Sequence, residues 1–205
     1  SFVAHVDAVV GEILDALDRT SMADDTLLFF TSDNGAHWTP DDEKKYPHRA
    51  NGAWRGQKAD IHEGGHRVPL LVRWPRRIDG QRLGQSDSNL VGLTDLMPTI
   101  AEAVGAPIPK GAAPDGISFL DAILNGDAGQ RQSIVHHSLH GMFAIRSGEW
   151  KWIEGLGSGG FTRPRQLKPE PGEPSGQLYH LREDPSEQVN RAAGEPAVVE
   201  RLQRQ

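Results

Sequence analysis

Residues 27–38, LLFFTSDNGAHW, decide how the chain is interpreted, because an apolar run ends there in Thr-Ser-Asp-Asn-Gly. Asn-Gly between alternating apolar residues is a strong signal for a two-residue hairpin turn. A hairpin needs a second strand directly afterwards, whereas residues 36–51 carry Pro40, Pro47 and the charge run 41–45. We therefore predict that a long loop follows the strand, and long loops inside compact domains are usually functional or mobile.

A helix is predicted before this strand, and a second strand after the loop. Residues 2–19 place valine, isoleucine and leucine at three- and four-residue spacings, which is the apolar stripe of an amphipathic helix. Residues 26–30 are almost wholly apolar, as expected of a strand covered on both faces, and residues 68–74 are interpreted as another buried strand. A helix followed by a buried strand favours a parallel α/β sheet.

A further helix is predicted over residues 95–104, because Gly105 can adopt the left-handed conformation that ends helices. Thr94 is its expected N-cap. Residues 118–124 are predicted to form a second, shorter helix. In the helix over residues 95–104, the side chains that we expect to face the core are Leu96, Ile100 and Val104.

From Ser133 onward the sequence consists of short apolar stretches at a spacing typical of a small antiparallel sheet. Residues 155–176 are rich in glycine, proline and charge, so a mobile excursion is expected there, and residues 196–202 predict a closing helix. The predicted fold class is α/β, with residues 1–130 in the main α/β domain and residues 131–205 in a small antiparallel subdomain. The expected strands of that subdomain are 134–137, 142–146, 150–154 and 178–181.

Composition excludes several classes of function. The 205 residues carry a formal net charge of −6, which argues against nucleic acid as a partner because binding a phosphate backbone needs a basic face. No apolar stretch approaches the ~20 residues needed to span a bilayer, so no membrane partner is expected. The absence of cysteine excludes disulfides, thiolate zinc sites and a cysteine nucleophile.

Asp33 and Asn34 are the first candidates for chemistry, because they directly follow a predicted strand. Open α/β sheets bind their ligands at the carboxyl ends of their strands. Carboxylate and amide oxygens are hard ligands, suited to calcium or magnesium rather than zinc. Two adjacent oxygens are too few to enclose a cation. From these residues alone, a simple turn or helix cap is the competing interpretation.

Lys58 is the second candidate, within a cluster of ionisable groups over residues 54–69, WRGQKADIHEGGHRVP. A lysine near a bound cation can hold an anionic substrate oxygen as a point charge, whereas elsewhere on a surface it would only be solvated. The spacing of His62 and His66 suits a zinc site on a helix, but Gly64-Gly65 between them makes a helix improbable. We predict structural roles for these histidines.

Two further interpretations concern charged and histidine side chains. Glu63 and Arg67 are predicted to form a local ion pair. The cluster His136, His137 and His140 superficially resembles a metal site, but adjacent strand residues point to opposite faces, so a shared ligand set is not expected.

Taken in order, the motifs resemble those of the carboxyl-terminal half of the sulfatase (arylsulfatase) family, within the alkaline-phosphatase-like superfamily. The resemblance implies the carboxyl-terminal part of a sulfatase-type α/β sheet domain, followed by a small antiparallel-sheet subdomain with a terminal helix. It also implies that Asp33 and Asn34 are ligands of a divalent cation, with calcium expected and magnesium the alternative, and that Lys58 contacts the sulfate group. The matching stretches are VDAVVGEILDAL, TLLFFTSDNG, RGQKADIHEGGHRVPLLVRWP, TDLMPTIAEAVGAP, DGISFLDAIL, GMFAIRSGEWKWI and LYHLREDPSEQVN.

The family's nucleophile and its early cation ligands, an aspartate pair, have no match in this sequence. Family members build a formylglycine from Cys/Ser-x-Pro-x-Arg, and this sequence has no such motif. The formylglycine and the remaining cation ligands are therefore expected upstream of this sequence. The resemblance implies a fragment of a sulfuric ester hydrolase, acting on a sulfate ester substrate, and we expect the chain alone to be inactive.

Three other functions remain open from the sequence. The chain could belong to a hydrolase of phosphate or phosphonate monoesters, since the superfamily shares its metal-centred scaffold across these anions. It could be a non-catalytic assembly subunit that pairs with the missing amino-terminal half as its partner. It could also be a remnant of a degraded gene.

Overall fold

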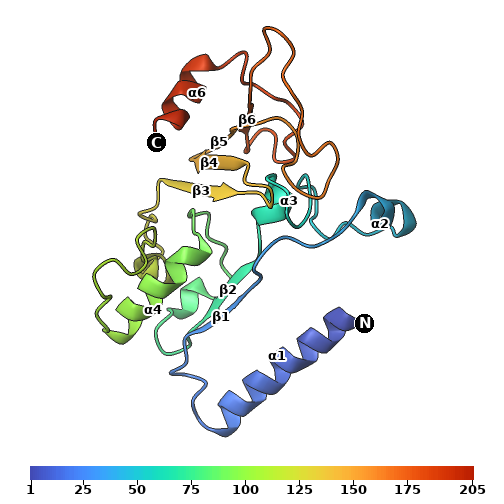
Figure 1. Ribbon diagram of the computed structural model, residues 1–205. Coiled ribbons are helices and arrows are strands. Elements are labelled where there is room, and N and C mark those ends of the chain that lie inside the picture. The colour runs from blue at the N-terminus through green and yellow to red at the C-terminus, as the bar shows by residue number, and fades with distance from the viewer. The chain divides into compact units, whose positions relative to one another are not determined.

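The computed structural model describes residues 1–205, which form two compact units (Figure 1). The first unit comprises Ser1–Thr31 and Pro69–Gln130, and the second comprises Ser32–Val68 and Arg131–Gln205. The long segment after the Asp-Asn-Gly sequence therefore belongs to the second unit, together with the carboxyl-terminal sheet. None of the helices combines the length and apolar character that a membrane span requires.

The first unit is built on a two-stranded sheet. β1 (Leu28–Thr31) pairs with β2 (Leu70–Arg73), and Leu28 lies opposite Arg73. The pairing is antiparallel, so the predicted parallel arrangement is wrong for these two strands. A parallel pair needs a crossover that packs back onto its own sheet, and here the connecting residues pack in the second unit instead.

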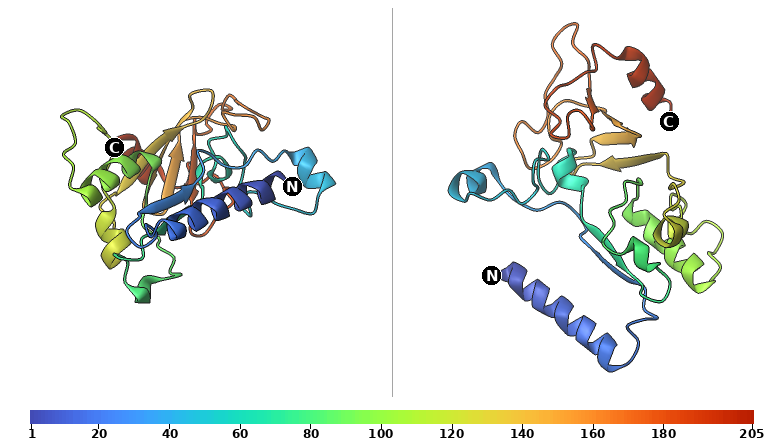
Figure 2. Two further views of the ribbon diagram at one scale, coloured as in Figure 1. Left: turned by 90° about the horizontal axis from the view of Figure 1, so that it is seen from below. Right: turned by 180° about the vertical axis from the view of Figure 1, so that it is seen from behind.

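Helices lie on both faces of this sheet (Figure 2). On one face α1 (Phe2–Arg19), whose bounds match the prediction, lines an apolar groove of about 420 Å³ with Phe30 and Leu71. On the other face α5 (Leu120–Asn125) packs against Phe29. Beside this groove Phe30 and Leu71 are 42% and 57% exposed and α1 buries none of its residues, so the expectation of strands covered on both faces is correct only for the side that meets α5.

α4 (Leu96–Val104) confirms one of its predicted ends and corrects the other. Gly105 ends the helix in the left-handed conformation, with φ of 67°. The N-cap is Asp95 rather than Thr94, although Asp95 makes no side-chain cap. Its buried carboxylate instead accepts the amides of Gly92 and Ile117, each at 2.8 Å. A 3₁₀ turn, Leu93–Asp95, precedes the helix, and another spans Gly80–Arg82.

The predicted inward face of α4 is only partly correct. Leu96 packs on the core, but Ile100 and Val104 are 44% and 71% exposed. The hydroxyl of Thr99 accepts the amide of Phe119 at 3.1 Å, and this buried hydrogen bond turns the Pro98-Thr99 side of the helix inward.

The second unit contains a four-stranded antiparallel meander, as predicted. Its strands are β3 (Ser133–His137), β4 (Phe143–Ser147), β5 (Trp150–Ile153) and β6 (Gln177–His180), paired in sequence order. α6 (Pro196–Gln203) covers one face, where Leu202 joins Ile145, Trp152 and Leu178. The alternate residues Ala144, Ile153 and Tyr179 form a second core with Ile61 on the other face.

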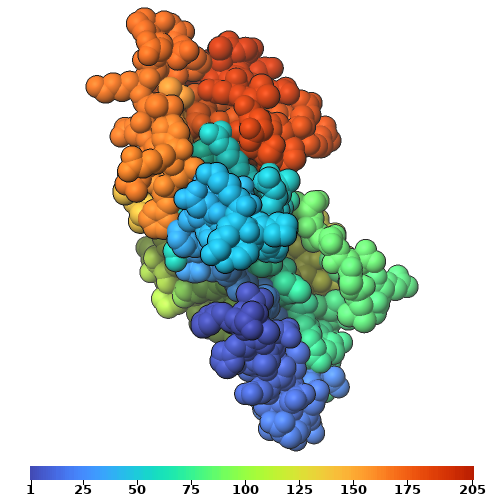
Figure 3. All heavy atoms as spheres, turned by 90° about the vertical axis from the view of Figure 1, so that its right-hand side faces the viewer, coloured from blue at the N-terminus to red at the C-terminus, as the bar shows by residue number.

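Two shorter helices lie in the segment that connects β1 to β2. α2 (Pro40–Lys45) begins at Thr39, whose hydroxyl and backbone amide exchange hydrogen bonds with Asp42. It buries none of its residues, and Figure 3 shows it at the surface in light blue. α3 (Glu63–His66) is a single helical turn, so the prediction that no helix spans Gly64-Gly65 is wrong.

The predicted excursion over residues 155–176 is irregular, but its first part is packed into the second unit. Residues 157–160 are buried. The carbonyl of Ser158 accepts the amide of Ile61 at 2.8 Å. This contact places the excursion beside the segment that carries Lys58.

Candidate functional site

The residues after β1 form a turn that is docked on α3 and not a tight hairpin. Ser32 Oγ donates to the carbonyl of Asn34 at 2.9 Å, and Asn34 Nδ2 donates to the carbonyl of Gly35 at 3.0 Å. The Gly35 amide in turn donates to the carbonyl of Gly65 at 2.9 Å. Asp33, at the apex, is exposed.

Three glycines allow this close approach of two backbone segments. A Cβ on Gly35 would lie 1.8 Å from the carbonyl oxygen of Gly64. A Cβ on Gly64 would lie 2.4 Å from the carbonyl oxygen of Gly56, and one on Gly65 would lie 2.2 Å from that of Asp60. The Gly-Gly sequence is therefore required by space, because α3 is packed between the Asp33-Asn34 turn and residues 55–60.

Lys58 lies next to the same turn through its backbone. Its amide donates to the carbonyl of Ala36 at 3.1 Å. Asn51 reinforces the junction, since its side chain bonds both the amide and the carbonyl of Ala36 and also reaches the carbonyl of Gly56. The structure thus brings the segments of Asp33-Asn34 and Lys58 together, while no hydrogen bond or ion pair joins the Asp33 and Lys58 side chains.

Asp60 shapes the turn that presents Lys58. Its carboxylate is fully buried and accepts the amides of Gln57 and Thr162, each at 3.0 Å. Ala59, between Lys58 and Asp60, adopts a φ of 80°, a conformation that costs a non-glycine residue of order 1–3 kcal/mol. The Lys58 side chain itself is exposed. A buried carboxylate therefore holds a strained backbone directly beside an exposed lysine.

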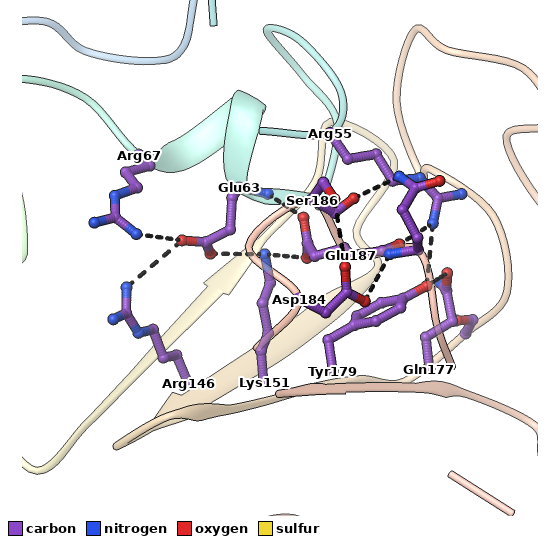
Figure 4. A network of polar contacts seen from close by, with 12 residues as sticks. Arg55, Glu63, Arg67, Arg146, Lys151, Gln177, Tyr179, Asp184, Ser186 and Glu187 are labelled. Carbon is purple, nitrogen blue, oxygen red and sulfur yellow. Dashed lines mark hydrogen bonds and ion pairs between the residues drawn. The ribbon is translucent and has the colours of Figure 1, made fainter. Parts of the chain in front are cut away.

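A buried network of charges lies beneath α3 (Figure 4). Lys151 is fully buried, with Nζ 3.1 Å from Glu63 Oε1 and 3.0 Å from Glu187 Oε1. The second distance is that of an ion pair without hydrogen-bond geometry. Arg146 and Arg67 lie 3.5 Å and 3.7 Å from Glu63 Oε2, so the predicted Glu63–Arg67 ion pair is present. Removing one member of such a buried pair typically costs about 3–5 kcal/mol.

The two buried carboxylates differ in their protonation equilibria. Burial alone would raise the pKa of Glu63, but the charges of Lys151 and Arg146 outweigh burial and lower this pKa. Burial raises the pKa of Glu187 in spite of Lys151. Glu63 is therefore the principal anionic partner of Lys151, and Glu187 takes up a proton more readily.

Three histidines around α3 are held neutral. Burial, followed by the charges of Arg55 and Lys151, lowers the pKa of His62 to about 2. Burial likewise lowers the pKa of His66 to about 4 and that of His136 to about 2. The rings of His66 and His136 pack with their centroids 4.3 Å apart. These histidines fill the interior beside α3, in agreement with the structural roles predicted for His62 and His66.

The chemistry of Asp33 and Asn34 fits a hard divalent cation. Asn34 uses its Nδ2 to bond the Gly35 carbonyl, which leaves the amide oxygen without a protein donor, and Asp33 is exposed. These two oxygens are too few for calcium, which takes 6–8. No group of three or more histidine, aspartate or glutamate side chains is arranged to hold a metal ion. The residues present thus fit part of a cation shell.

Sequence reasoning missed the polar residues that support these segments, of which all but the partly buried Asn51 are fully buried. Asn51, Asp60, Lys151 and Glu187 have partners far away in the sequence, so no local pattern indicates them. Lys151 offered one signal, because it lies between Trp150 and Trp152 in a strand. Because neighbouring strand residues point to opposite faces of a sheet, the two tryptophans share one face and Lys151 points to the other. Buried residues cover that second face as well.

Known proteins resemble most of the chain in sequence. The family model for sulfatases matches residues 1–106. An N-acetylgalactosamine-6-O-sulfatase of Bacteroides thetaiotaomicron is 34% identical over 98% of this chain and 39% of its own length. Human steryl-sulfatase is 44% identical over 56% of this chain and 19% of its own length.

Solved structures show the same fold. A Bacteroides thetaiotaomicron structure from work on the metabolism of multiple glycosaminoglycans superposes with a TM-score of 0.81 and 32% identity, covering 97% of this chain and 42% of that one. A Pseudoalteromonas sulfatase superposes with a TM-score of 0.76 and 24% identity, covering 98% and 40%. The chain thus spans about two fifths of the length of these relatives. Because the family model covers residues 1–106 and a relative one third identical aligns with nearly the whole sequence, the chain belongs to the sulfatase family.

Proposed function

We propose that this chain supplies part of the cation and sulfate site of an enzyme that hydrolyses sulfate monoesters. The observation that supports this most directly is the backbone junction at Ala36 and Gly35. One hydrogen bond of this junction fixes Lys58 to Ala36, and another fixes the Asp33-Asn34 turn to Gly65. The two candidate segments thus share one rigid support.

Asp33 and Asn34 are proposed as two oxygen ligands of a divalent cation, with calcium favoured and magnesium the alternative. When bound, such a cation withdraws charge from the sulfate oxygens. The formylglycine nucleophile and the remaining ligands are proposed to come from residues outside this sequence. The contribution of this chain is to hold the two oxygens close to Lys58.

Lys58 is proposed to bind a sulfate oxygen through its ammonium group. A lysine acts as a compact point charge, so it can follow the sulfate as negative charge shifts during cleavage of the ester bond. Its exposure in this structure leaves the ammonium accessible to a ligand. The buried Asp60 carboxylate fixes the backbone of the turn, so the side chain extends from a defined position.

The substrate is proposed to be a sulfate monoester of a sugar or a hydrophobic alcohol. The relatives named above comprise an N-acetylgalactosamine-6-O-sulfatase and a steryl-sulfatase. A panel of an aryl sulfate, N-acetylgalactosamine 6-sulfate, a steryl sulfate and an aryl phosphate separates these classes. Faster turnover of the aryl phosphate than of every sulfate would identify a phosphohydrolase instead.

The decisive test replaces the proposed sulfate-binding lysine in the complete product of the gene. Lys58→Ala is expected to lower kcat/KM for the best sulfate ester by about 10²-fold or more, because it removes a charge aimed at the reacting group. Lys110→Ala is the matched control, since Lys110 is also exposed but lies in the first unit. Equal activities of the two variants would refute the role of Lys58, and an inactive wild-type protein would favour an assembly subunit or a gene remnant.

A further inference from the structure

We propose that Glu187 is a positioning residue for the candidate sulfate site, because it holds both ends of the segment that carries Lys58. This inference rests on the proposed function for its catalytic meaning. The Glu187 carboxylate accepts the amide of Glu63 through Oε2 at 2.7 Å. Its backbone carbonyl accepts a hydrogen bond from Arg55 Nη1 at 2.8 Å. Lys58 lies between these two attachments.

The first attachment explains why α3 forms at all. A single helical turn with two glycines has little intrinsic stability, since glycine is among the poorest helix formers and short helices depend on tertiary contacts. His62 makes no side-chain cap. The Glu187 carboxylate satisfies the first free amide of α3 in its place, and Gly64 donates the next amide to the carbonyl of Arg55 at 2.7 Å.

α3 transmits this constraint to the candidate residues. The carbonyl of Gly65 accepts the amide of Gly35, and the carbonyl of Gly64 occupies the space where Gly35 would have a side chain. The position of the Asp33-Asn34 turn therefore depends on where α3 lies. The Lys58 amide, bonded to Ala36, follows the same turn.

The second attachment acts on the other end of the segment. Arg55 also donates to the hydroxyl of Tyr179 on β6 at 3.1 Å. Tyr179 in turn donates to Gln177 Oε1 at 2.8 Å. The guanidinium is thus held between a strand of the sheet and the Glu187 carbonyl, as Figure 4 shows.

Glu187 is itself held firmly enough to serve as an anchor. It is fully buried and has a φ of 51°, a left-handed conformation unusual for glutamate. Asp184 stabilises this turn, because its Oδ2 accepts the amides of Gln188 and Val189 at 2.7 Å and 2.8 Å. Lys151 fixes the carboxylate from β5 at 3.0 Å.

The first experiment measures amide hydrogen exchange in this chain by NMR. Glu187→Leu keeps a side chain of similar size at the strained backbone position but removes the carboxylate that accepts the Glu63 amide. Exchange at the Gly35 and Lys58 amides should therefore accelerate about tenfold or more, relative to exchange at the β4–β5 amides. Glu187→Gln keeps an oxygen that can accept the Glu63 amide and should restore slow exchange. The result that would overturn the inference is slow exchange at both amides in Glu187→Leu.

Leu202→Ala is the control for general loss of stability, because Leu202 belongs to α6 and packs on the opposite face of the same sheet. It should not accelerate exchange selectively at Gly35 and Lys58, and a selective effect there would contradict the proposal. If Glu187→Leu does not fold, Arg55→Met tests the other attachment. This variant should accelerate hydrogen exchange at the Lys58 amide, and unchanged exchange there would likewise refute the proposal.

The second experiment measures kcat/KM for a sulfate ester in the complete gene product. Glu187→Leu should lower kcat/KM about tenfold or more, Glu187→Gln should recover most of it, and Leu202→Ala should leave it unchanged in the folded fraction. Released amides with no effect of Lys58→Ala on turnover would refute the proposed function and leave the anchoring role intact. Unaffected amides would refute the anchoring role whatever the turnover.

Discussion

A side chain on Gly35 would meet the carbonyl oxygen of Gly64 at 1.8 Å, so these two residues fix how closely the Asp33-Asn34 turn approaches α3. The obstacle is backbone, which cannot rotate away as a side chain can. The contact also brings the Gly35 amide to the carbonyl of Gly65. Close packing between backbones thus sets the position of the two proposed cation ligands.

Gly35→Ala is expected to lower the free energy of unfolding by about 1–3 kcal/mol, the usual cost of forcing extra volume into a packed site. Urea denaturation measures this change. Gly80→Ala is the matched control, since a Cβ on Gly80 meets no atom within 4 Å. Equal stability of Gly35→Ala and Gly80→Ala would show that the turn can move away from α3.

Calcium should bind this chain weakly, with a Kd of about 1 mM or weaker, because Asp33 and Asn34 supply far fewer oxygens than the 6–8 that calcium takes. Isothermal titration calorimetry measures the affinity. Asp33→Ala should abolish the remaining binding heat. Micromolar affinity in the unmodified chain would mean that other residues complete the cation shell.

Stability should fall as the pH is lowered from 7 to 5, because three histidines are neutral in the folded chain. Their pKa values are lowered from 6.5 to about 2, 4 and 2 for His62, His66 and His136, so below pH 6.5 the unfolded state binds more protons. Each contributes up to about 1.4 kcal/mol per pH unit. Glu187 acts in the opposite direction because its pKa is raised. The three histidines together should cost about 6 kcal/mol between pH 7 and 5, and Glu187 offsets part of this, so the net loss is expected to be about 3 kcal/mol or more, measured by urea denaturation at each pH.

A histidine variant separates this effect from other titrations. His136→Asn removes one titrating group and should make stability less dependent on pH between 7 and 5, even where the variant is less stable at pH 7. A slope equal to that of the unmodified chain would show that His136 titrates normally in the folded state.

Elements whose signal is local were predicted well. The apolar stripe gave α1 its bounds, Phe2–Arg19, and short alternating stretches gave the strands of the carboxyl-terminal sheet. Gly105 marked a helix end because its left-handed conformation depends on that residue alone. Periodicity and turn residues act within a few positions, so a single sequence reveals them.

Features that depend on distant partners were not predictable in the same way. The antiparallel pairing of β1 with β2 depends on where the intervening residues pack, and the exposure of Ile100 depends on a hydrogen bond between Thr99 and Phe119. The anchoring of the candidate site by Glu187 involves residues with no local pattern. Asp33, Asn34 and Lys58 were found from motif and position, and their roles as ligands stay predictions.

The separation of the network residues along the chain also bears on biosynthesis. Glu63 finds Lys151 and Glu187 respectively 88 and 124 residues further on. At roughly 5–20 residues per second, a ribosome needs on the order of ten seconds to extend a nascent chain from the first of these residues to the last. The Lys58 segment therefore acquires its native attachments only after residue 187 has been translated, and a premature stop codon before that residue would release a product in which they never form.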